Sequence, residues 1–323
     1  MINRRQALAG VLAGPLGLAG VAAQTNFPSH PVRLIVGYTA GGAVDLIARS
    51  LGQQLQASLG QPVVIDNRPG AGTNIAIKLL ADSPPDGYTL MLAANALAAN
   101  VSLYEPAPYN LAKDITPIAL VGRVPVVLAV AANAPYANLQ QFIAAAKAKP
   151  QSVNFATPGN GSTPHLAMEL FERAAGIQLT HVPYKGGAQA ITDVLGGHVQ
   201  SVAVNALEVQ PHVQGGRMRV LGVMTPRRTS IFPDVPTVAE SGFPGFESSV
   251  WYMLVGPANM PAAVVSRLHG DVEKALANEE VRQRLASAGG EVTTGPGAQA
   301  AKLLQDEATR YGRLIHEAHI KAD

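Results

Sequence analysis

Neutral hydrogen-bonding side chains and glycines gather in four loops, each placed between a strand-like apolar run and a helix-like segment. The loops cover residues 40–45, 70–74, 157–165 and 184–188. Backbone N–H groups at the start of a helix lack partners and lie at the positive end of the helix dipole, which suits an anion. The side chains that add neutral donors are Thr39, Thr73, Asn74, Asn160, Ser162 and Thr163. This pattern predicts a site for a small carboxylate that needs no arginine.

Two charged residues in these loops have structural alternatives to a role in binding. Asp45 stands near the start of a helix, where a carboxylate is stabilised by the helix dipole and by capping whatever the function. Lys185 either reaches an anion or is solvated. Both alternatives stay open from the sequence.

Ser162 and His165 could form a hydrolase pair, because a histidine can activate a nearby serine hydroxyl. Ser162 does not lie in a G-x-S-x-G elbow, and no motif places a carboxylate that would orient the histidine. His181 is expected to pack within its strand and not to bind a ligand. We predict no catalytic residue and keep a hydrolase acting on a small acid as the alternative.

Motifs for metals and nucleotides are incomplete. His316 and His319 are one residue short of H-E-x-x-H spacing, which favours an exposed terminal helix. Gly70 and Gly72 are followed by Ile75, where a dinucleotide fingerprint needs a third glycine, and no glycine loop ends in Gly-Lys-Ser/Thr. We predict neither a metal nor a cofactor.

Strand-like and helix-like segments alternate, which predicts an α/β fold with mostly parallel sheets. The expected strands are 32–36, 62–65, 88–92, 153–156, 180–184, 199–204, 219–223 and 251–255, and residues 120–121 and 126–130 form two apolar runs separated by residues 122–125. Helices are expected at residues 75–81, 139–147, 262–277 and 298–316. Three further helices are expected: one begins near Val44, one begins at Pro164, and one contains Ile191 and Leu195. Ligands of open α/β sheets bind beyond the carboxyl ends of the strands, where all four loops would emerge.

The helix that opens at Pro164 is delimited by its own sequence. Thr163 is expected to be its N-cap, proline suits the first helical position, and Gly176 suits the residue after the last turn. One loop and one helix start are therefore predicted residue by residue.

The chain has 323 residues, 47% hydrophobic and 14% charged, which is enough for two domains with sizeable cores. Residues 1–23 are typical of a cleaved export signal: Arg4 and Arg5 precede the apolar residues 8–18, and the small residues 21–23 resemble a cleavage site. The apolar run is too short to span a membrane. The Sec and Tat routes are not distinguished.

Charge and cysteine content narrow the class further. Loss of the two leader arginines leaves 22 basic against 22 acidic residues, so the predicted mature chain has no net charge and no indication of nucleic-acid binding. The absence of cysteine excludes disulfides and a lipidated cysteine anchor. A periplasmic protein fits these properties.

The order of the loops resembles the extracytoplasmic solute-binding receptors of tripartite tricarboxylate transporters, the Bug family, over nearly the whole predicted mature chain. Six blocks are similar, at residues 38–45, 61–72, 85–90, 159–166, 181–187 and 234–242. They include the sequences YTAGGAVD, QPVVIDNRPGAG, GNGSTPHL and HVPYKGG.

The resemblance implies a two-domain periplasmic binding protein of type II, a Venus flytrap whose domains are each a mostly parallel sheet flanked by helices. Domain 1 is expected from residues 24–124 plus 230–323 and domain 2 from residues 125–229, with a return crossing in residues 226–244. Such a protein would be a monomer that binds a small organic acid and delivers it to a membrane permease. A receptor that signals to a sensor kinase remains a further alternative.

The loops and the resemblance together predict the ligand-binding residues. In the family, the first loop, the Asn-Gly-Ser/Thr loop and the loop after the Val-Pro-Tyr strand approach the ligand. The predicted residues are Tyr38, Ala40, Gly41, Gly42, Asp45, Gly72, Thr73, Thr157, Asn160, Gly161, Ser162, Thr163, His165, Tyr184, Lys185, Gly186 and Asn205.

Two departures from the family pattern lead to a hypothesis about the ligand. Ala40 stands where the family usually has proline, which could loosen the first loop. Val204 stands where the family tends to have an acid that faces the cleft and would favour an amino group. The sequence therefore favours a plain or aromatic carboxylate over an amino acid.

Overall fold

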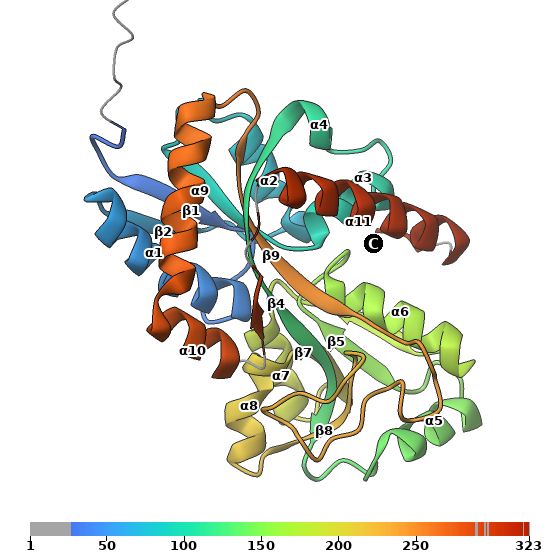
Figure 1. Ribbon diagram of the computed structural model, residues 1–323. Coiled ribbons are helices and arrows are strands. Elements are labelled where there is room, and N and C mark those ends of the chain that lie inside the picture. The colour runs from blue at the N-terminus through green and yellow to red at the C-terminus, as the bar shows by residue number, and fades with distance from the viewer. Residues whose placement is uncertain (1–26, 288–289, 294, 296, 319, 323) are drawn as a thin grey trace, which may run out of the picture.

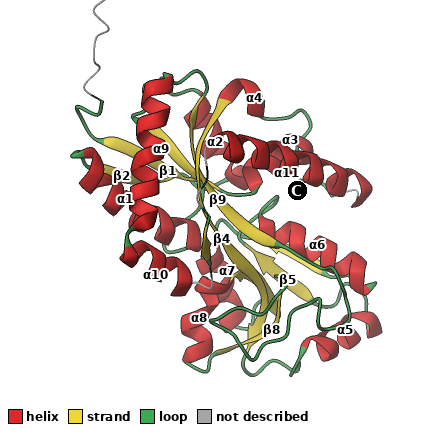
Figure 2. Ribbon diagram, viewed as in Figure 1, coloured by secondary structure: helices red, strands yellow, loops and turns green. Residues whose placement is uncertain are grey.

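The computed structural model describes residues 27–287, 290–293, 295, 297–318 and 320–322. The predicted export signal lies outside these residues. The described chain forms two α/β halves joined through a continuous, strongly curled sheet, with helices on both faces of each half (Figures 1 and 2). None of the described helices is both long enough and apolar enough to cross a membrane.

The strands of the described residues are hydrogen-bonded in the order β2-β1-β3-β9-β4-β7-β5-β6, with β8 and β10 also paired to β4. Their bounds are β1 (Val32–Val36), β2 (Val63–Asn67), β3 (Thr89–Ala93), β4 (Ile115–Ala131), β5 (Asn154–Thr157), β6 (Thr180–Pro183), β7 (Ser201–Asn205), β8 (Met218–Val223), β9 (Ser249–Pro257) and β10 (Glu291–Val292).

The helices flank this sheet. Their bounds are α1 (Ala43–Leu59), the 3₁₀ turn η1 (Ala71–Thr73), α2 (Asn74–Ala81), α3 (Ala96–Leu103), α4 (Leu111–Asp114), α5 (Leu139–Ala148), α6 (Thr163–Ala175), α7 (Gly187–Leu195), α8 (Ala206–Gln214), α9 (Ala262–Ala277), α10 (Glu279–Ser287) and α11 (Gly297–Ala318).

The first half is built on β1, with β2 and β3 parallel to it on either side and β9 antiparallel to β3. Successive side chains of a strand point to opposite faces. Leu34 and Val36 accordingly pack in one core with α1 and α9, whereas Ile35 packs in another with α2, α3 and α11. Both faces of β1 are covered, which explains its uninterrupted apolar sequence.

Strand β4 connects the two halves (Figure 1). Its residues up to Pro125 pair with β9, and from Val126 onward it pairs with β7 and β8. The two apolar runs at 120–121 and 126–130 therefore belong to one continuous strand, and Gly122 and Pro125, which separate them in the sequence, lie within it. The domain boundary at residues 124/125 stays a prediction, and the change of pairing partner falls beside it.

The second half contains the parallel strands β5, β6 and β7, with β4 antiparallel to β7. Helices α5 and α6 pack on one face, in the core that extends from the first half. Helices α7 and α8 cover the other face with a separate cluster that includes Val127, Ile191 and Val209. The carboxyl ends of β5, β6 and β7 are followed by α6, α7 and α8.

Most predicted elements are confirmed, and the differences are local. Ser162, and not Thr163, is the N-cap of α6, since its hydroxyl accepts the His165 N–H; Gly176 ends the helix in the left-handed conformation, as expected. Helices α3, α4, α8 and α10 and the 3₁₀ turn η1 were not predicted. Helix α3 is apolar and buried on most sides, so it lacks a polar face, and α8 contains Pro211.

Candidate ligand-binding site

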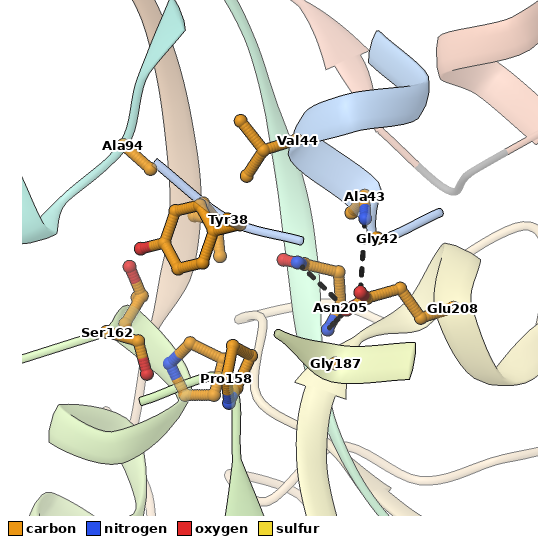
Figure 3. A pocket seen from close by; sticks show the side chains of 13 residues that line it. Tyr38, Gly42, Ala43, Val44, Ala94, Pro158, Ser162, Gly187, Asn205 and Glu208 are labelled. Carbon is orange, nitrogen blue, oxygen red and sulfur yellow. Dashed lines mark hydrogen bonds between the residues drawn. The ribbon is translucent and has the colours of Figure 1, made fainter. Parts of the chain in front are cut away.

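The N-termini of four helices converge on one pocket between the two halves. Helix α1 comes from the first half, and α6, α7 and α8 come from the second. Figure 3 shows the side chains of the pocket, with Tyr38 facing Ser162 and Pro158 across it. The lining residues are Tyr38, Gly42, Ala43, Val44, Ala94, Pro158, Ser162, Thr163, Pro164, Gly187, Asn205, Glu208 and Val250.

Side chains of the protein accept only some of the free backbone N–H groups at the helix starts of this pocket. Gly42 and Gly186, which precede α1 and α7, provide no side-chain cap. The Thr163 hydroxyl oxygen at the start of α6 is buried without a hydrogen-bond partner, and the residue is only 2% exposed. Four positive helix ends and an unpartnered hydroxyl form an environment that favours a negatively charged group.

Loops from the two halves touch each other around the pocket. The Thr39 N–H donates to the Lys185 carbonyl oxygen at 3.2 Å, and the Ala43 N–H donates to Glu208 Oε1 at 3.1 Å. The pocket has a volume of about 20 Å³, room for one or two water molecules. An organic acid therefore fits in this pocket only if the halves separate.

Glu208 is the one acidic side chain among the described residues that line this pocket. Its Oε1 accepts the Ala43 N–H across the cleft (Figure 3), and its Oε2 accepts the Asn205 N–H and side-chain amide at 3.2 and 3.3 Å. Burial raises the pKa of Glu208, and these N–H groups oppose the shift only in part. Burial and the negative charge of Glu208 also raise the pKa of the Tyr38 hydroxyl.

A second cavity of about 220 Å³ adjoins the first at Tyr38 and Pro158. It lies between the loop at residues 70–73 and the strand ends of the second half. The predicted residues that line it, besides Tyr38, are Gly72, Thr73, Asn160, Tyr184 and Lys185. Lys185 is exposed, and the Tyr184 hydroxyl donates to Asp193.

Asp45 forms hydrogen bonds within the first half. Its carboxylate accepts the Gly41 N–H, the Arg49 guanidinium and the Asn67 amide. Burial works to raise the pKa of Asp45, but these partners together hold it below its usual value. Neither Asp45 nor Gly41 lines either cavity, and neither does the exposed Ala40.

Ser162 and His165 do not form a nucleophile and base pair. The Ser162 hydroxyl accepts the backbone N–H of His165, while His165 Nδ1 accepts the Gly161 N–H at 3.2 Å. The His165 ring stacks on His181, whose Nε2 lies 2.6 Å from Thr157 Oγ1. Burial, aided by His165, lowers the pKa of His181 to about 2, and its packing within the strand is confirmed.

The structure brings together part of the predicted set. Tyr38, Gly42, Ser162, Thr163 and Asn205 line the first pocket. The predicted residues that line neither cavity are Ala40, Gly41, Asp45, Thr157, Gly161, His165 and Gly186. The role of the whole set in ligand binding stays a prediction.

Val204 does not face the cleft, contrary to expectation. It is 0% exposed and packs in the core under α7 and α8. The acid that does face the pocket is Glu208, which the sequence reasoning missed. The available signal was Asn205 followed three residues later by a glutamate, the spacing of a capping box, which the structure forms at the start of α8.

Metal-binding clusters are absent among the described residues, where no three acidic or histidine side chains could hold an ion together. His319 lies outside those residues. The polar groups that line the pocket are backbone N–H groups, hydroxyls, the Asn205 amide and the Glu208 carboxylate.

Comparison with known proteins identifies the family. Residues 47–320 match the model of the tripartite tricarboxylate transporter family receptor. The chain is 34% identical to protein BugT of Bordetella pertussis, over 99% of each chain. It resembles the solved periplasmic binding protein BugD (28% identity, TM-score 0.88) and an R. palustris protein solved with adipate (32% identity, TM-score 0.88); each alignment covers 92% of this chain and 100% of the other.

These similarities confirm the two-domain fold of periplasmic binding proteins. They also decide against the hydrolase alternative, because the family and its solved members are solute-binding proteins and not enzymes. The chain belongs to the tripartite tricarboxylate transporter receptor family.

Proposed function

We propose that this chain is a monomeric periplasmic receptor that binds a small organic carboxylate between its two halves and delivers it to the membrane permease of a tripartite transporter. Residues 1–23 would direct its export and be removed. The four helix N-termini at the pocket are the observation on which the proposal rests, because they favour an anion where no basic side chain lines the pocket.

The relatives support the chemical class of the ligand. The family description names a tricarboxylate transporter, and the R. palustris structure contains adipate. Binding requires a hinge motion in this proposal, since the described pocket holds no more than water. A ligand that contacts both halves would then stabilise the closed state.

A thermal-shift screen of the chain without residues 1–23 tests the function. A ligand that binds only the folded protein raises the melting temperature by mass action. We expect a rise with at least one member of a panel of mono-, di- and tricarboxylates and amino acids at millimolar concentration. No rise with any of them would contradict the proposal.

Thr163→Val provides a matched variant for the strongest hit. Valine has nearly the same shape as threonine but lacks the hydroxyl, and the Thr163 hydroxyl has no hydrogen-bond partner in the free protein. The unliganded melting temperature should therefore change little. Affinity should fall about tenfold if the hydroxyl donates to the bound carboxylate. An unchanged affinity would place the carboxylate elsewhere.

A further inference from the structure

Glu208 occupies the position that the start of α1 would otherwise offer to an anion. Its Oε1 accepts the Ala43 N–H, the first N–H of α1, although Glu208 belongs to the opposite half of the protein. The bond is therefore made across the cleft in which the proposed ligand binds (Figure 3).

Two glycines form a close fit around this oxygen. A Cβ atom at Gly187 would lie 2.3 Å from Glu208 Oε1, and one at Gly42 would lie 3.2 Å from it. Gly187 is the first residue of α7 and Gly42 precedes α1. The absence of side chains at both helix starts is what lets the carboxylate enter.

Glu208 lacks a cationic partner. In the described part of the chain no ion pair involves it, and none of the residues that line the pocket is lysine, arginine or histidine. Its three hydrogen bonds come from neutral N–H groups, and a carboxylate has about four acceptor positions. A half-buried carboxylate in this situation is a strong site for a cation.

We propose that Glu208 determines ligand specificity by pairing with an ammonium group, so that the ligand is a small amino acid and not a plain carboxylate. This inference rests on the proposed function, since it describes the ligand of the same pocket.

Opening of the cleft makes the pairing possible. When the halves separate, the bond between Ala43 and Glu208 breaks and leaves an N–H donor on one side and a carboxylate on the other. An amino acid satisfies both: its carboxylate accepts the Ala43 N–H and its ammonium donates to Glu208. A plain carboxylate satisfies only Ala43 and brings a second negative charge close to Glu208, which is unfavourable.

Calorimetric titration of matched ligand pairs tests the inference. The pairs are aspartate and succinate, glutamate and glutarate, and 4-aminobutyrate and butyrate. For the pair that contains the tightest ligand, we expect the unmodified protein to bind the amino compound at least tenfold more tightly. In Glu208→Gln that preference should disappear or reverse, because the amide still accepts N–H bonds but has no charge.

Glu172→Gln is the control. Glu172 lies near the end of α6, away from the pocket, and its carboxylate also accepts a backbone N–H, from Leu179. Its substitution should leave the preference unchanged. Glu208→Asp keeps the charge with a shorter reach and should bind more weakly but retain the sign of the preference, which provides a second variant if Glu208→Gln does not fold.

The outcomes separate this inference from the proposed function. Tighter binding of the plain carboxylate by the unmodified protein would overturn the inference and leave the function intact. A preference unchanged in Glu208→Gln would also overturn it, since the ammonium would then bind elsewhere. Absence of binding with every pair and with the carboxylate panel would overturn both.

Discussion

Two carboxylates accept N–H groups at the same helix start but in opposite circumstances. Asp45 belongs to α1 itself, and its partners Gly41, Arg49 and Asn67 all come from the first half. Glu208 reaches the start of α1 from α8 across the cleft and has no cationic partner among the described residues. The difference separates a carboxylate that stabilises one half from a carboxylate that is available to a ligand.

The pKa directions agree with this distinction. Burial acts to raise the pKa of both groups. Arg49 and the other donors outweigh burial at Asp45 and lower its pKa, whereas the neutral donors at Glu208 do not, and its pKa is raised. A carboxylate that is paired with a cation of the protein is a poor candidate for a ligand-binding group, whereas a carboxylate without such a cation is a good one.

The largest expected effect is on stability at Asp45. Asp45→Ala removes a 2% exposed carboxylate, which leaves the Gly41 N–H without its acceptor and leaves the Asn67 amide only the Tyr38 carbonyl oxygen. We expect the free energy of unfolding to fall by about 3 kcal/mol. Urea denaturation measures it, and the preference between amino and plain carboxylates should not change.

Asp82→Ala is the control for this substitution. Asp82 also pairs with a cation one helical turn away, Lys78, but its side chain is 62% exposed. Exposed pairs of this kind contribute less than about 0.5 kcal/mol. The distinction between Asp45 and Glu208 would fail if Asp45→Ala lowered the free energy of unfolding no more than Asp82→Ala does. It would also fail if Asp45→Ala changed the ligand preference.

The next effect concerns the fit around Glu208. Gly187→Ala places a Cβ 2.3 Å from Glu208 Oε1, so the carboxylate must move. We expect a cost of about 1 to 2 kcal/mol in stability from overpacking and an affinity for the preferred ligand about tenfold lower. Calorimetric titration and urea denaturation measure the two effects.

Gly270→Ala serves as the matched glycine variant. Gly270 lies within α9 with nothing within 4 Å of its Cβ position, so alanine should stabilise the helix by about 0.5 to 1 kcal/mol and leave binding unchanged. Equal binding by Gly187→Ala and the unmodified protein would show that the position of Glu208 does not matter to the ligand.

The fold could be predicted from the sequence because its main elements have strong local signals. Strand β1 and helix α9 were predicted with their observed bounds, since an apolar β-branched run and a regular apolar face identify them. Helix α3 has no such signal, because it is buried on most sides. The continuity of β4 through Pro125 depends on its pairing with β9, which the sequence does not reveal.

The site could be predicted only as far as its loops. Glycines and hydroxyls at helix starts identified Gly42, Ser162 and Thr163, which do line the pocket. Glu208 was missed because it lies outside the glycine loops and meets the start of α1 only through a hydrogen bond across the cleft, which the sequence does not reveal. Val204 was predicted to face the cleft, although its side chain is buried in the core beneath α7 and α8.

The smallest expected effect is a difference in pH dependence between the two carboxylates, measured by urea denaturation of the unliganded protein from pH 2.5 to pH 8. The pKa of Asp45 is lowered by folding, so its stabilising contribution is present above its unfolded pKa and is lost as the pH falls through the folded value. The pKa of Glu208 is raised, so its contribution is present at low pH and is lost as the pH rises through the folded value.

Each carboxylate is compared with its neutral isostere, because the contributions of the other titrating groups to the free energy of unfolding then cancel in the difference. The stability of the unmodified protein relative to Asp45→Asn should increase as the pH rises from 2.5 to about 5, whereas its stability relative to Glu208→Gln should decrease as the pH rises above about 4.5. Slopes of the same sign would contradict the assignment of opposite roles. A saturating amino-acid ligand should abolish the Glu208 slope and leave the Asp45 slope unchanged, because an ammonium beside Glu208 supplies the cation that Asp45 already has in Arg49.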